Sequence, residues 1–165
     1  MKNSFIPARR AAQTAQTVQT TQTAQAPAQT SYANVNPANT DNASTAELRA
    51  SIVEYAMQYL GNKYVRGGQS LATGTDCSGF TCYVYKEFGY SLSRTPSGQY
   101  KSNGRSISLS EAQPGDIVCY GSGGCTHVAL YIGDNQILHA ANSRRGVVIN
   151  DADYQTILGV KNVLD

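Results

Sequence analysis

The chain lacks a long hydrophobic run and carries little net charge. No apolar stretch approaches the ~18 residues of a membrane-spanning helix, so we expect no membrane span. The net charge is +2 overall, and from residue 44 onward ten Lys or Arg balance ten Asp or Glu. A neutral domain argues against nucleic acid or an anionic membrane surface as the main partner.

Cysteine and histidine are scarce, with four and two copies. No two cysteines form a Cys-x-x-Cys pair, which argues against a redox module. Cys119, Cys125, His127 and His139 are residue types that bind zinc, but Cys-x5-Cys-x-His is not a usual zinc spacing. We therefore expect no metal or other cofactor, and we keep a zinc-binding module as an alternative.

The first 43 residues have little to bury. Between residues 11 and 30, every residue except Val18 and Pro27 is Ala, Gln or Thr, and Gln recurs at every third position from 13 to 25. Such a tract cannot offset the entropy lost on folding. We predict a disordered tail or linker over residues 1–43 and a folded domain over residues 44–165.

The folded part begins with helical patterns. Ser44 and Glu47 have the spacing of a capping box, and apolar residues then recur with helical spacing until Gly61 ends the run. Thr95 and Pro96 are typical of the N-cap and the first residue of a later helix. The predicted helices are residues 44–60, 78–88 and 93–103.

The second half of the chain has the pattern of strands. Short segments rich in β-branched residues are separated by Gly, Asn and Asp turns, as in an antiparallel sheet of about five strands. Helices precede the sheet, so we predict an α+β fold with N-terminal helices packed on the sheet. The predicted strands are residues 116–120, 126–132, 136–140, 146–150 and 157–163.

Cys77 lies in the first turn of the predicted helix 78–88 and follows Asp76. Unpaired N–H groups and the helix dipole favour a thiolate there, so we predict that the Cys77 pKa is below the free value of ~8.5. A cysteine of this kind is a candidate nucleophile. The alternative is a small buried cysteine, with Asp76 as an ordinary N-cap.

His127 and His139 fall on adjacent predicted strands joined by residues 133–135. A three-residue loop would place both imidazoles on one face, directly opposite or one step diagonal. His127 could then take the Cys77 proton while His139 holds His127 in the useful tautomer, with helix N–H groups as oxyanion donors. The alternative is a pair of half-buried structural histidines.

Four short segments carry a family resemblance. They are Asp-Cys-Ser-Gly-Phe at 76–80, Gln-Pro-Gly-Asp-Ile-Val at 113–118, His-Val-Ala-Leu-Tyr-Ile-Gly at 127–133 and Ile-Leu-His-Ala at 137–140. In this order and spacing they closely resemble the NlpC-type cell-wall peptidases of the papain-like clan, from about residue 48 to the C-terminus. The resemblance implies a papain-like fold and a Cys-His-His triad of Cys77 as nucleophile, His127 as base and His139 as third member.

The resemblance also implies substrate contacts. Residues 61–68 resemble the family's Gly-x-Pro-Tyr-x-Trp-Gly-Gly segment, with Lys63 and Arg66 in place of Pro and Trp, which implies a more polar groove wall. Helix capping and solvation are the alternative roles for these polar side chains. The residues implied as substrate contacts are Tyr64, Asp76, Ser78 and Arg94.

The function implied by the resemblance is hydrolysis of peptidoglycan stem peptides, typically between D-glutamate and the following diamino acid. Arg94 or Arg66 would bind the α-carboxylate of D-glutamate, and Asp76 a free amino terminus. The alternatives are an N-acetylmuramoyl-L-alanine amidase and a non-catalytic cell-wall-binding module. We expect a monomer in an extracellular or cell-wall location, although the basic first ten residues precede no apolar signal segment.

The other cysteines have separate predicted roles. Cys82 lies about 140° around the helix from Cys77, so it should point away from the candidate site. Cys119 and Cys125 flank the glycine-rich loop 120–124. If the protein is exported, we expect these two to form a disulfide that steadies the loop.

Overall fold

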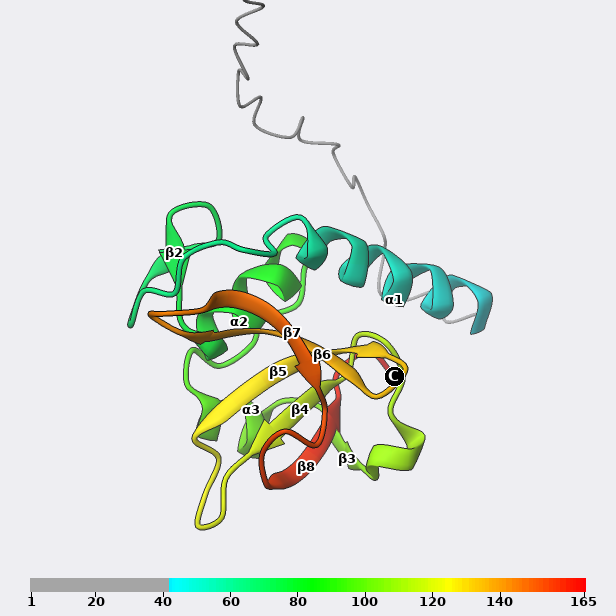
Figure 1. Cartoon of the computed structure of the whole chain (residues 1–165). Coiled ribbons are helices and arrows are strands. Elements are labelled where there is room, and N and C mark those ends of the chain that lie inside the picture. Colours follow the sequence, from blue (N-terminus) through cyan, green and yellow to red (C-terminus); the bar gives the residue numbers. More distant parts are fainter. Residues whose placement is uncertain (1–41) are drawn as a thin grey trace, which may run out of the picture. The chain divides into compact units, whose positions relative to one another are not determined.

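The computed structural model describes residues 42–165, which contain three α-helices, one 3-10 turn and two antiparallel sheets (Figure 1). The predicted tail, residues 1–43, lies outside this part of the chain apart from Asn42 and Ala43, which begin the first helix. No helix between residues 42 and 165 is long and apolar enough to cross a membrane. The helices are α1 (Asn42–Met57), α2 (Cys77–Glu87), α3 (Pro96–Ser102) and the 3-10 turn η1 (Leu109–Glu111).

Helix α1 begins two residues earlier than predicted. Because Asn42 and Ala43 are already helical, Ser44 lies inside the helix, and the predicted capping box with Ser44 as N-cap is wrong. The α-helix ends at Met57, and single turns continue the chain to Gly61, whose φ of 85° ends the helical path. The apolar stripe of α1, which includes the fully buried Ile52, packs into the core as the helical spacing predicted.

Helix α2 has the cap and the buried face that the sequence predicted. The Asp76 carboxylate is the N-cap and accepts a hydrogen bond of 2.9 Å from the Gly79 N–H. Phe80 and Val84 are fully buried on the face that contacts β5 and β6. Burial of two such side chains contributes about 3–6 kcal/mol, so this helix is firmly held on the sheet.

Helix α3 forms as predicted but starts later than residue 93. The Thr95 hydroxyl is its N-cap and accepts a hydrogen bond of 3.1 Å from the Gly98 N–H. Pro96 is the first helical residue, where its missing N–H removes no helical hydrogen bond.

The main sheet has six antiparallel strands in the order β3-β8-β4-β5-β6-β7, one more than the predicted number of about five. The additional strand, β3, pairs only three residues with β8, which is too short for a periodic signal in the sequence. Helices before the sheet confirm the α+β class. The strands are β1 (Gln69–Ser70), β2 (Gly74–Thr75), β3 (Arg105–Ile107), β4 (Ile117–Tyr120), β5 (His127–Gly133), β6 (Gln136–Asn142), β7 (Gly146–Asp151) and β8 (Ile157–Asn162).

The β5–β6 hairpin places both histidines on one face, as predicted, but through a different turn. Asp134 and Asn135 have φ values of 50° and 56°, as in a two-residue type I′ turn. A bulge between Tyr131 and Gly133 adds one residue to β5. The bulge offsets the even loop length, so the two histidine positions stay one diagonal step apart.

Two apolar clusters fill the fold. One includes Cys77 and Phe80 and brings residues of the helices together with residues of the sheet, while the other contains Val118 and Tyr120. Ile117 of β4 belongs to the first cluster, so adjacent residues of this strand pack into different clusters, because successive side chains of a strand point to opposite faces. Figure 1 shows α1 and α2 together on the same side of the sheet.

A buried ion pair ties α1 to the sheet. The Arg49 guanidinium donates hydrogen bonds of 2.9 Å to Asp116 and 3.0 Å to the Pro114 carbonyl, and it contacts the Asp165 carboxylate at 3.2 Å. The side chains of Arg49 and Asp116 are 5% and 0% exposed. The pair therefore joins the first helix to the start of β4 and to the C-terminus.

Candidate active site

Cys77 is the first residue of α2 and lies against the strand that carries His127. Its side chain is almost buried, with the residue 7% exposed. The backbone N–H groups of Val128 and Ser78 lie close enough to the sulfur to act on its pKa. Since Val128 directly follows His127, the candidate nucleophile lies beside the first residues of β5.

The predicted lowering of the Cys77 pKa is wrong. Burial raises the pKa of the thiol, and the nearby Asp76 carboxylate raises it further. The N–H groups of Val128 and Ser78 act in the opposite direction but do not outweigh burial. At neutral pH Cys77 is therefore a thiol, and a nearby base must remove its proton when it reacts.

The two histidines form a close pair at the start of β5 and in the middle of β6. His127 Nε2 lies 2.7 Å from His139 Nδ1, with the ring planes at 82°. His139 is only 1% exposed, whereas His127 is half-buried. This contact occupies Nε2 of His127 and leaves its Nδ1 as the nitrogen that can serve a thiol.

Burial lowers the pKa of both imidazoles to about 4. For His127 the neighbouring His139 adds to the effect, and for His139 the cationic Arg145 adds to it while the Asn150 hydrogen bond opposes it. Both rings are therefore neutral at pH 7, and a neutral imidazole can accept a proton.

Two further side chains contact His139, and the sequence analysis assigned neither of them to the site. Asn150 Oδ1, on β7, lies 3.3 Å from His139 Nε2. The Tyr154 hydroxyl lies 3.4 Å from His139 Nδ1, and its ring packs against His139 and Tyr120 with centroids 5.1 Å away in each case. The one signal available for Asn150 was its place as a polar residue at the end of the predicted strand 146–150.

The predicted substrate contacts Asp76, Ser78 and Arg94 come together, but they bind one another. The Arg94 guanidinium contacts the Asp76 carboxylate at 2.6 and 3.1 Å. Ser78 donates a hydrogen bond of 2.7 Å to the Arg94 carbonyl. A Cβ on Gly79 would overlap the Thr75 hydroxyl and lie 2.9 Å from Arg94 Nη2, so only glycine leaves room for this arrangement.

The Asp76 carboxylate is fully engaged in this network. Besides Arg94, it accepts hydrogen bonds from the N–H groups of Gly67 at 2.7 Å and Gly79 at 2.9 Å. Burial raises the pKa of Asp76, but Arg94 and these N–H groups outweigh it and hold the pKa below its usual value. In this structure the charges of Asp76 and Arg94 neutralise each other, and their separate binding to charged ends of a substrate stays a prediction.

Tyr64 also lies near the candidate nucleophile. A single bridge pairs its backbone with Thr75, two residues before Cys77. Burial raises the pKa of Tyr64, and the proximity of Cys77 and Asp76 raises it further, so the hydroxyl stays protonated and can donate a hydrogen bond.

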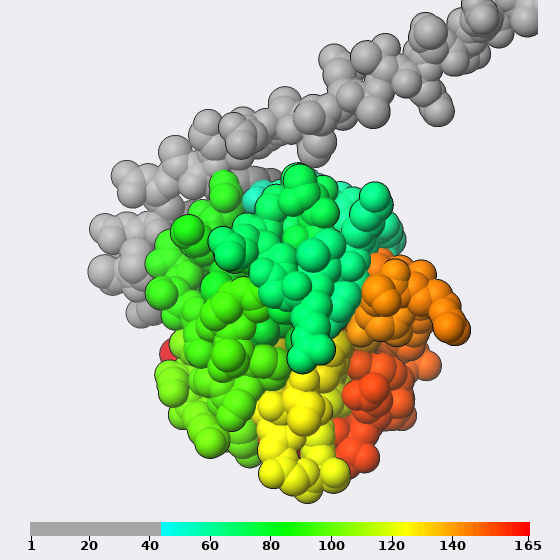
Figure 2. Space-filling model, turned by 90° about the vertical axis from the view of Figure 1, so that its left-hand side faces the viewer, coloured from blue at the N-terminus to red at the C-terminus, as the bar shows by residue number. Residues whose placement is uncertain are grey.

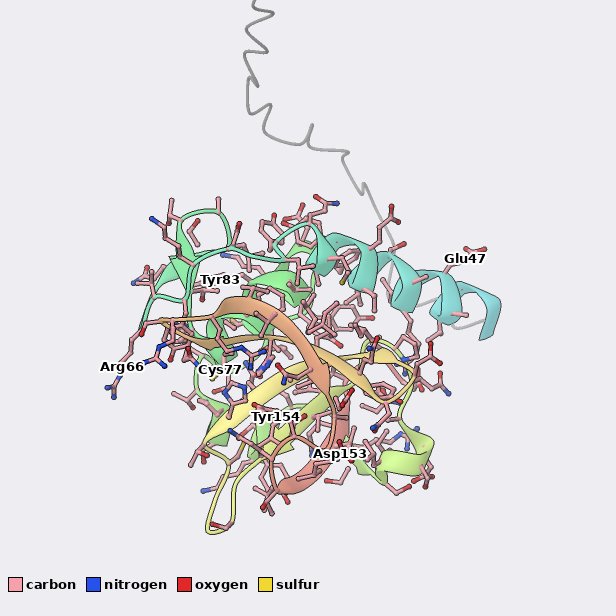
Figure 3. All side chains as sticks on the ribbon, viewed as in Figure 1. Glu47, Arg66, Cys77, Tyr83, Asp153 and Tyr154 are labelled. Carbon is pink, nitrogen blue, oxygen red and sulfur yellow. The ribbon has the colours of Figure 1, made fainter. Side chains whose placement is uncertain are left out.

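An open pocket of about 560 Å³ adjoins the Asp76–Arg94 pair. In Figure 3 Cys77 lies between Tyr83 and Tyr154, while Arg66 extends outward from the fold. Figure 2 shows the face on which the chain around residues 60–70, in teal, borders the orange β6–β7 turn and the yellow chain below it. The pocket is lined by Gly67, Gln69, Asp76, Ser78, Tyr83, Arg94, Thr95 and Pro96.

The remaining cysteines are free thiols. The Cys82 thiol donates to the Leu92 carbonyl at 3.4 Å, away from the histidines, as predicted. Cys119 and Cys125 are both free here, and the Cys125 thiol donates to the His127 carbonyl at 3.4 Å; the disulfide expected for exported protein stays a prediction. The loop between them is closed by the backbone hydrogen bond of 2.9 Å from Thr126 to Tyr120.

The zinc alternative finds no support in the geometry. Among residues 42–165, no three His, Cys, Asp or Glu side chains are grouped so that they could hold a metal ion. His127 Nε2 and His139 Nδ1, the two nitrogens that face each other, form a hydrogen bond.

Comparison with known proteins identifies the family to which this fold and these motifs belong. The NlpC/P60 family model matches residues 61–158. The chain belongs to the NlpC/P60 family, as the sequence resemblance predicted.

Similar proteins agree with this assignment. The chain is 42% identical over 123 residues to a probable endopeptidase p60 of Listeria grayi, covering 74% of this chain and 23% of that protein. It thus spans about a quarter of the length of that relative. The solved NlpC/p60 domain of the peptidoglycan hydrolase SagA has a TM-score of 0.63 and 34% identity, covering 69% of this chain and 97% of that one. The peptidoglycan hydrolase RipB of Mycobacterium tuberculosis has a TM-score of 0.69 and 27% identity, covering 78% and 71%.

Proposed function

We propose that this protein is a cysteine endopeptidase that hydrolyses peptidoglycan stem peptides at the cell wall. Cys77 is the nucleophile, His127 the base and His139 the residue that orients the base. The observation that carries the proposal is the 2.7 Å contact between His127 on β5 and His139 on β6, since β5 is also the strand that lies beside Cys77. The names of the relatives, endopeptidase and peptidoglycan hydrolase, support the same reaction and substrate class.

The reaction starts from an uncharged thiol and an uncharged imidazole. As the Cys77 sulfur adds to the substrate carbonyl, its proton passes to Nδ1 of His127. The new positive charge on His127 is stabilised by donation from Nε2–H to His139 Nδ1. We assign the Cys77 backbone N–H and the Tyr64 hydroxyl as donors to the oxyanion, because both lie at the nucleophile.

The reaction is completed in two steps, collapse of the tetrahedral intermediate to an acyl-enzyme and hydrolysis of that acyl-enzyme. The carbon–nitrogen bond breaks, His127 returns its proton to the leaving amine, and the acyl group stays on Cys77 as a thioester. Water, deprotonated by His127, attacks the thioester. The carbon–sulfur bond then breaks, His127 returns the proton to the Cys77 sulfur, and the second fragment leaves as a carboxylic acid. The thiol is restored with no net change in the protein.

We assign the bond as the one between γ-linked D-glutamate and the following diamino acid. The pocket beside Cys77 presents the Asp76–Arg94 ion pair rather than a free charge of either sign. Such a pair makes polar contacts with a peptide but gives little preference for a free ammonium group. The site therefore suits stem peptides whose L-alanine nitrogen is acylated as well as free peptides.

Activity is expected to fall in acid only near pH 4. Burial lowers the pKa of His127 to about 4, so above this pH the ring is neutral and can accept the Cys77 proton, whereas below it the ring is protonated and cannot. The dependence of kcat/KM on pH measures this directly, since it reports the essential base of the free enzyme. An acid limb near the ordinary histidine pKa of about 6.5 would show that the buried pair is not the base.

The assigned bond is tested by three purified substrates. We expect release of the diamino acid from L-Ala-γ-D-Glu-diamino-acid tripeptide, and kcat/KM within about threefold when its amino terminus is acetylated, because the Asp76 charge is already neutralised. An intact muramoyl-L-alanine peptide should lose the same diamino acid and keep its muramoyl amide. Products are identified by mass.

Two results would overturn parts of this assignment. Cleavage only at the muramoyl amide would make the protein an amidase. A strong preference for the free amino terminus would mean that Asp76 exchanges Arg94 for the substrate ammonium group on binding.

A further inference from the structure

We propose that Asn150 is a positioning residue that fixes which nitrogen of His139, and through it which nitrogen of His127, carries the proton. This inference rests on the proposed function, since it concerns the base of that reaction. No motif of the sequence includes Asn150. The inference comes from the position of its amide group behind the histidine pair.

Strand pairing places Asn150 where it can reach His139. In the β6–β7 register, Ile137 lies opposite Asn150 and His139 lies opposite Val148. Residues that are opposite, or two apart along a strand, share a face, so Asn150 is one diagonal step from His139 on the same side of the sheet. The resulting contact, from Asn150 Oδ1 to His139 Nε2, is 3.3 Å.

Asn150 Oδ1 is the acceptor at the end of the contacts that join Asn150, His139 and His127, and it determines which ring nitrogens carry hydrogen. An amide oxygen can only accept, so His139 Nε2 carries a hydrogen and Nδ1 of the same neutral ring does not. Because His139 Nδ1 is an acceptor, the 2.7 Å contact requires His127 to donate from Nε2. Neutral His127 then has its lone pair on Nδ1, which is the nitrogen left for the Cys77 proton.

Tyr154 supports the same tautomer from another direction. Its hydroxyl lies 3.4 Å from His139 Nδ1, the atom that already accepts from His127. Burial and the proximity of Cys77 raise the pKa of Tyr154 to about 12, so the hydroxyl keeps its proton and acts as a donor. A second donor directed at Nδ1 disfavours a hydrogen on that nitrogen.

The opposite tautomer would be unable to catalyse the reaction. If His139 carried its hydrogen on Nδ1, His127 would have to accept at Nε2 and carry its own hydrogen on Nδ1. That hydrogen would block transfer from Cys77. The wrong tautomer of a catalytic histidine is known to be a severe defect, which is why the partner of an orienting residue matters.

The groups around the histidine pair explain why an amide fits better than a carboxylate. The His127 ring packs against Tyr120 on β4 and Tyr154 after β7, and the next residue, Val128, lies beside Cys77; none of these side chains is charged at neutral pH. The positive charge of Arg145, in the β6–β7 turn, also acts on His139 and lowers its pKa. A carboxylate at position 150 would favour imidazolium at His139, which would then donate from both nitrogens and force the wrong tautomer on His127.

The test compares kcat and kcat/KM against pH for wild type, Asn150→Leu and Asn150→Asp. The Leu variant removes the acceptor at similar size, and we expect kcat to fall about 10- to 100-fold at every pH with KM little changed, the range found for outer partners of functional imidazoles. The Asp variant keeps an acceptor. At alkaline pH we expect this variant to have activity near that of wild type. The acid limb of its pH profile should move from about pH 4 to higher pH.

Asp151→Asn is the matched control, because it changes the charge of the next residue on β7, which is exposed and faces the other way. It should leave the acid limb in place. An Asn150→Leu enzyme within about twofold of wild type, or an Asn150→Asp limb that does not move, would overturn the proposal; a purely structural role predicts no displacement of the limb.

A second measurement needs no variant and no substrate. Imidazole ¹⁵N chemical shifts of the wild-type protein at pH 7 should show hydrogen on Nε2 of both His127 and His139. Hydrogen on Nδ1 of either ring would overturn the inference. Because this readout is independent of hydrolysis, it separates failure of the tautomer assignment from failure of the proposed function.

Discussion

Replacing Cys77 with alanine is expected to lower kcat on a stem-peptide substrate about a million-fold, the scale of loss when a covalent nucleophile is removed. The reason is that no other group forms the acyl bond. The fold should be retained, because the change removes only one sulfur from a residue that caps no helix and holds no ion pair. Initial rates with the tripeptide measure the loss, and circular dichroism checks the fold.

Cys82→Ala is the matched control for this experiment. Cys82 is on the same helix, but its thiol donates to the Leu92 carbonyl, so wild-type turnover is expected. His127→Ala should resemble Cys77→Ala, whereas His139→Ala should leave more activity, because water can replace an orienting residue in part. Undiminished turnover by Cys77→Ala would end the cysteine-peptidase interpretation.

Replacing Arg49 with methionine is expected to lower the free energy of unfolding by about 3–5 kcal/mol, since it leaves a buried carboxylate without its cation. Asp116 is 0% exposed, and its other hydrogen bond comes only from the Gln113 N–H at 2.8 Å. Burial raises the pKa of Asp116, so without Arg49 the folded protein takes up a proton at this carboxyl. The loss should therefore be smaller in acid than at neutral pH, which urea unfolding at both pH values measures.

Arg105→Met is the matched control, because it removes the same charge from a surface pair. Arg105 is 58% exposed and lies 3.9 Å from Asp165, so its loss should change the free energy of unfolding by less than about 1 kcal/mol. The double variant Arg49→Met/Asp116→Leu should recover much of the stability, because no charge stays buried. Equal losses for the two Arg→Met variants would contradict the role given to the buried pair.

The sequence was informative wherever a local signal determines structure. Asp76 and Thr95 cap their helices through contacts three residues away, and Pro96 fits only the first turn. The spacing of the two histidines predicted a shared face, which the structure has. The prediction succeeded only because the number of extra residues stayed odd. A two-residue turn and one bulge residue take the place of the expected three-residue loop.

Properties that arise from distant packing were not accessible in the same way. The Cys77 pKa was predicted from the helix start, but burial by the sheet dominates it. Asp76 and Arg94 are 18 residues apart, and no local pattern showed that they neutralise each other. Asn150 reaches His139 only through the β6–β7 register, which the turn residues between these strands do not determine by themselves.

The most direct test of the account is covalent labelling by a substrate-like electrophile, L-Ala-γ-D-Glu carrying a chloromethyl ketone in place of the scissile amide. We predict one adduct per protein, located on Cys77 by peptide mass mapping, with activity lost in proportion to labelling. Cys82, Cys119 and Cys125 should stay unmodified. Hydrolysis that continues in protein fully alkylated on Cys77, or inactivation without an adduct there, would contradict the account.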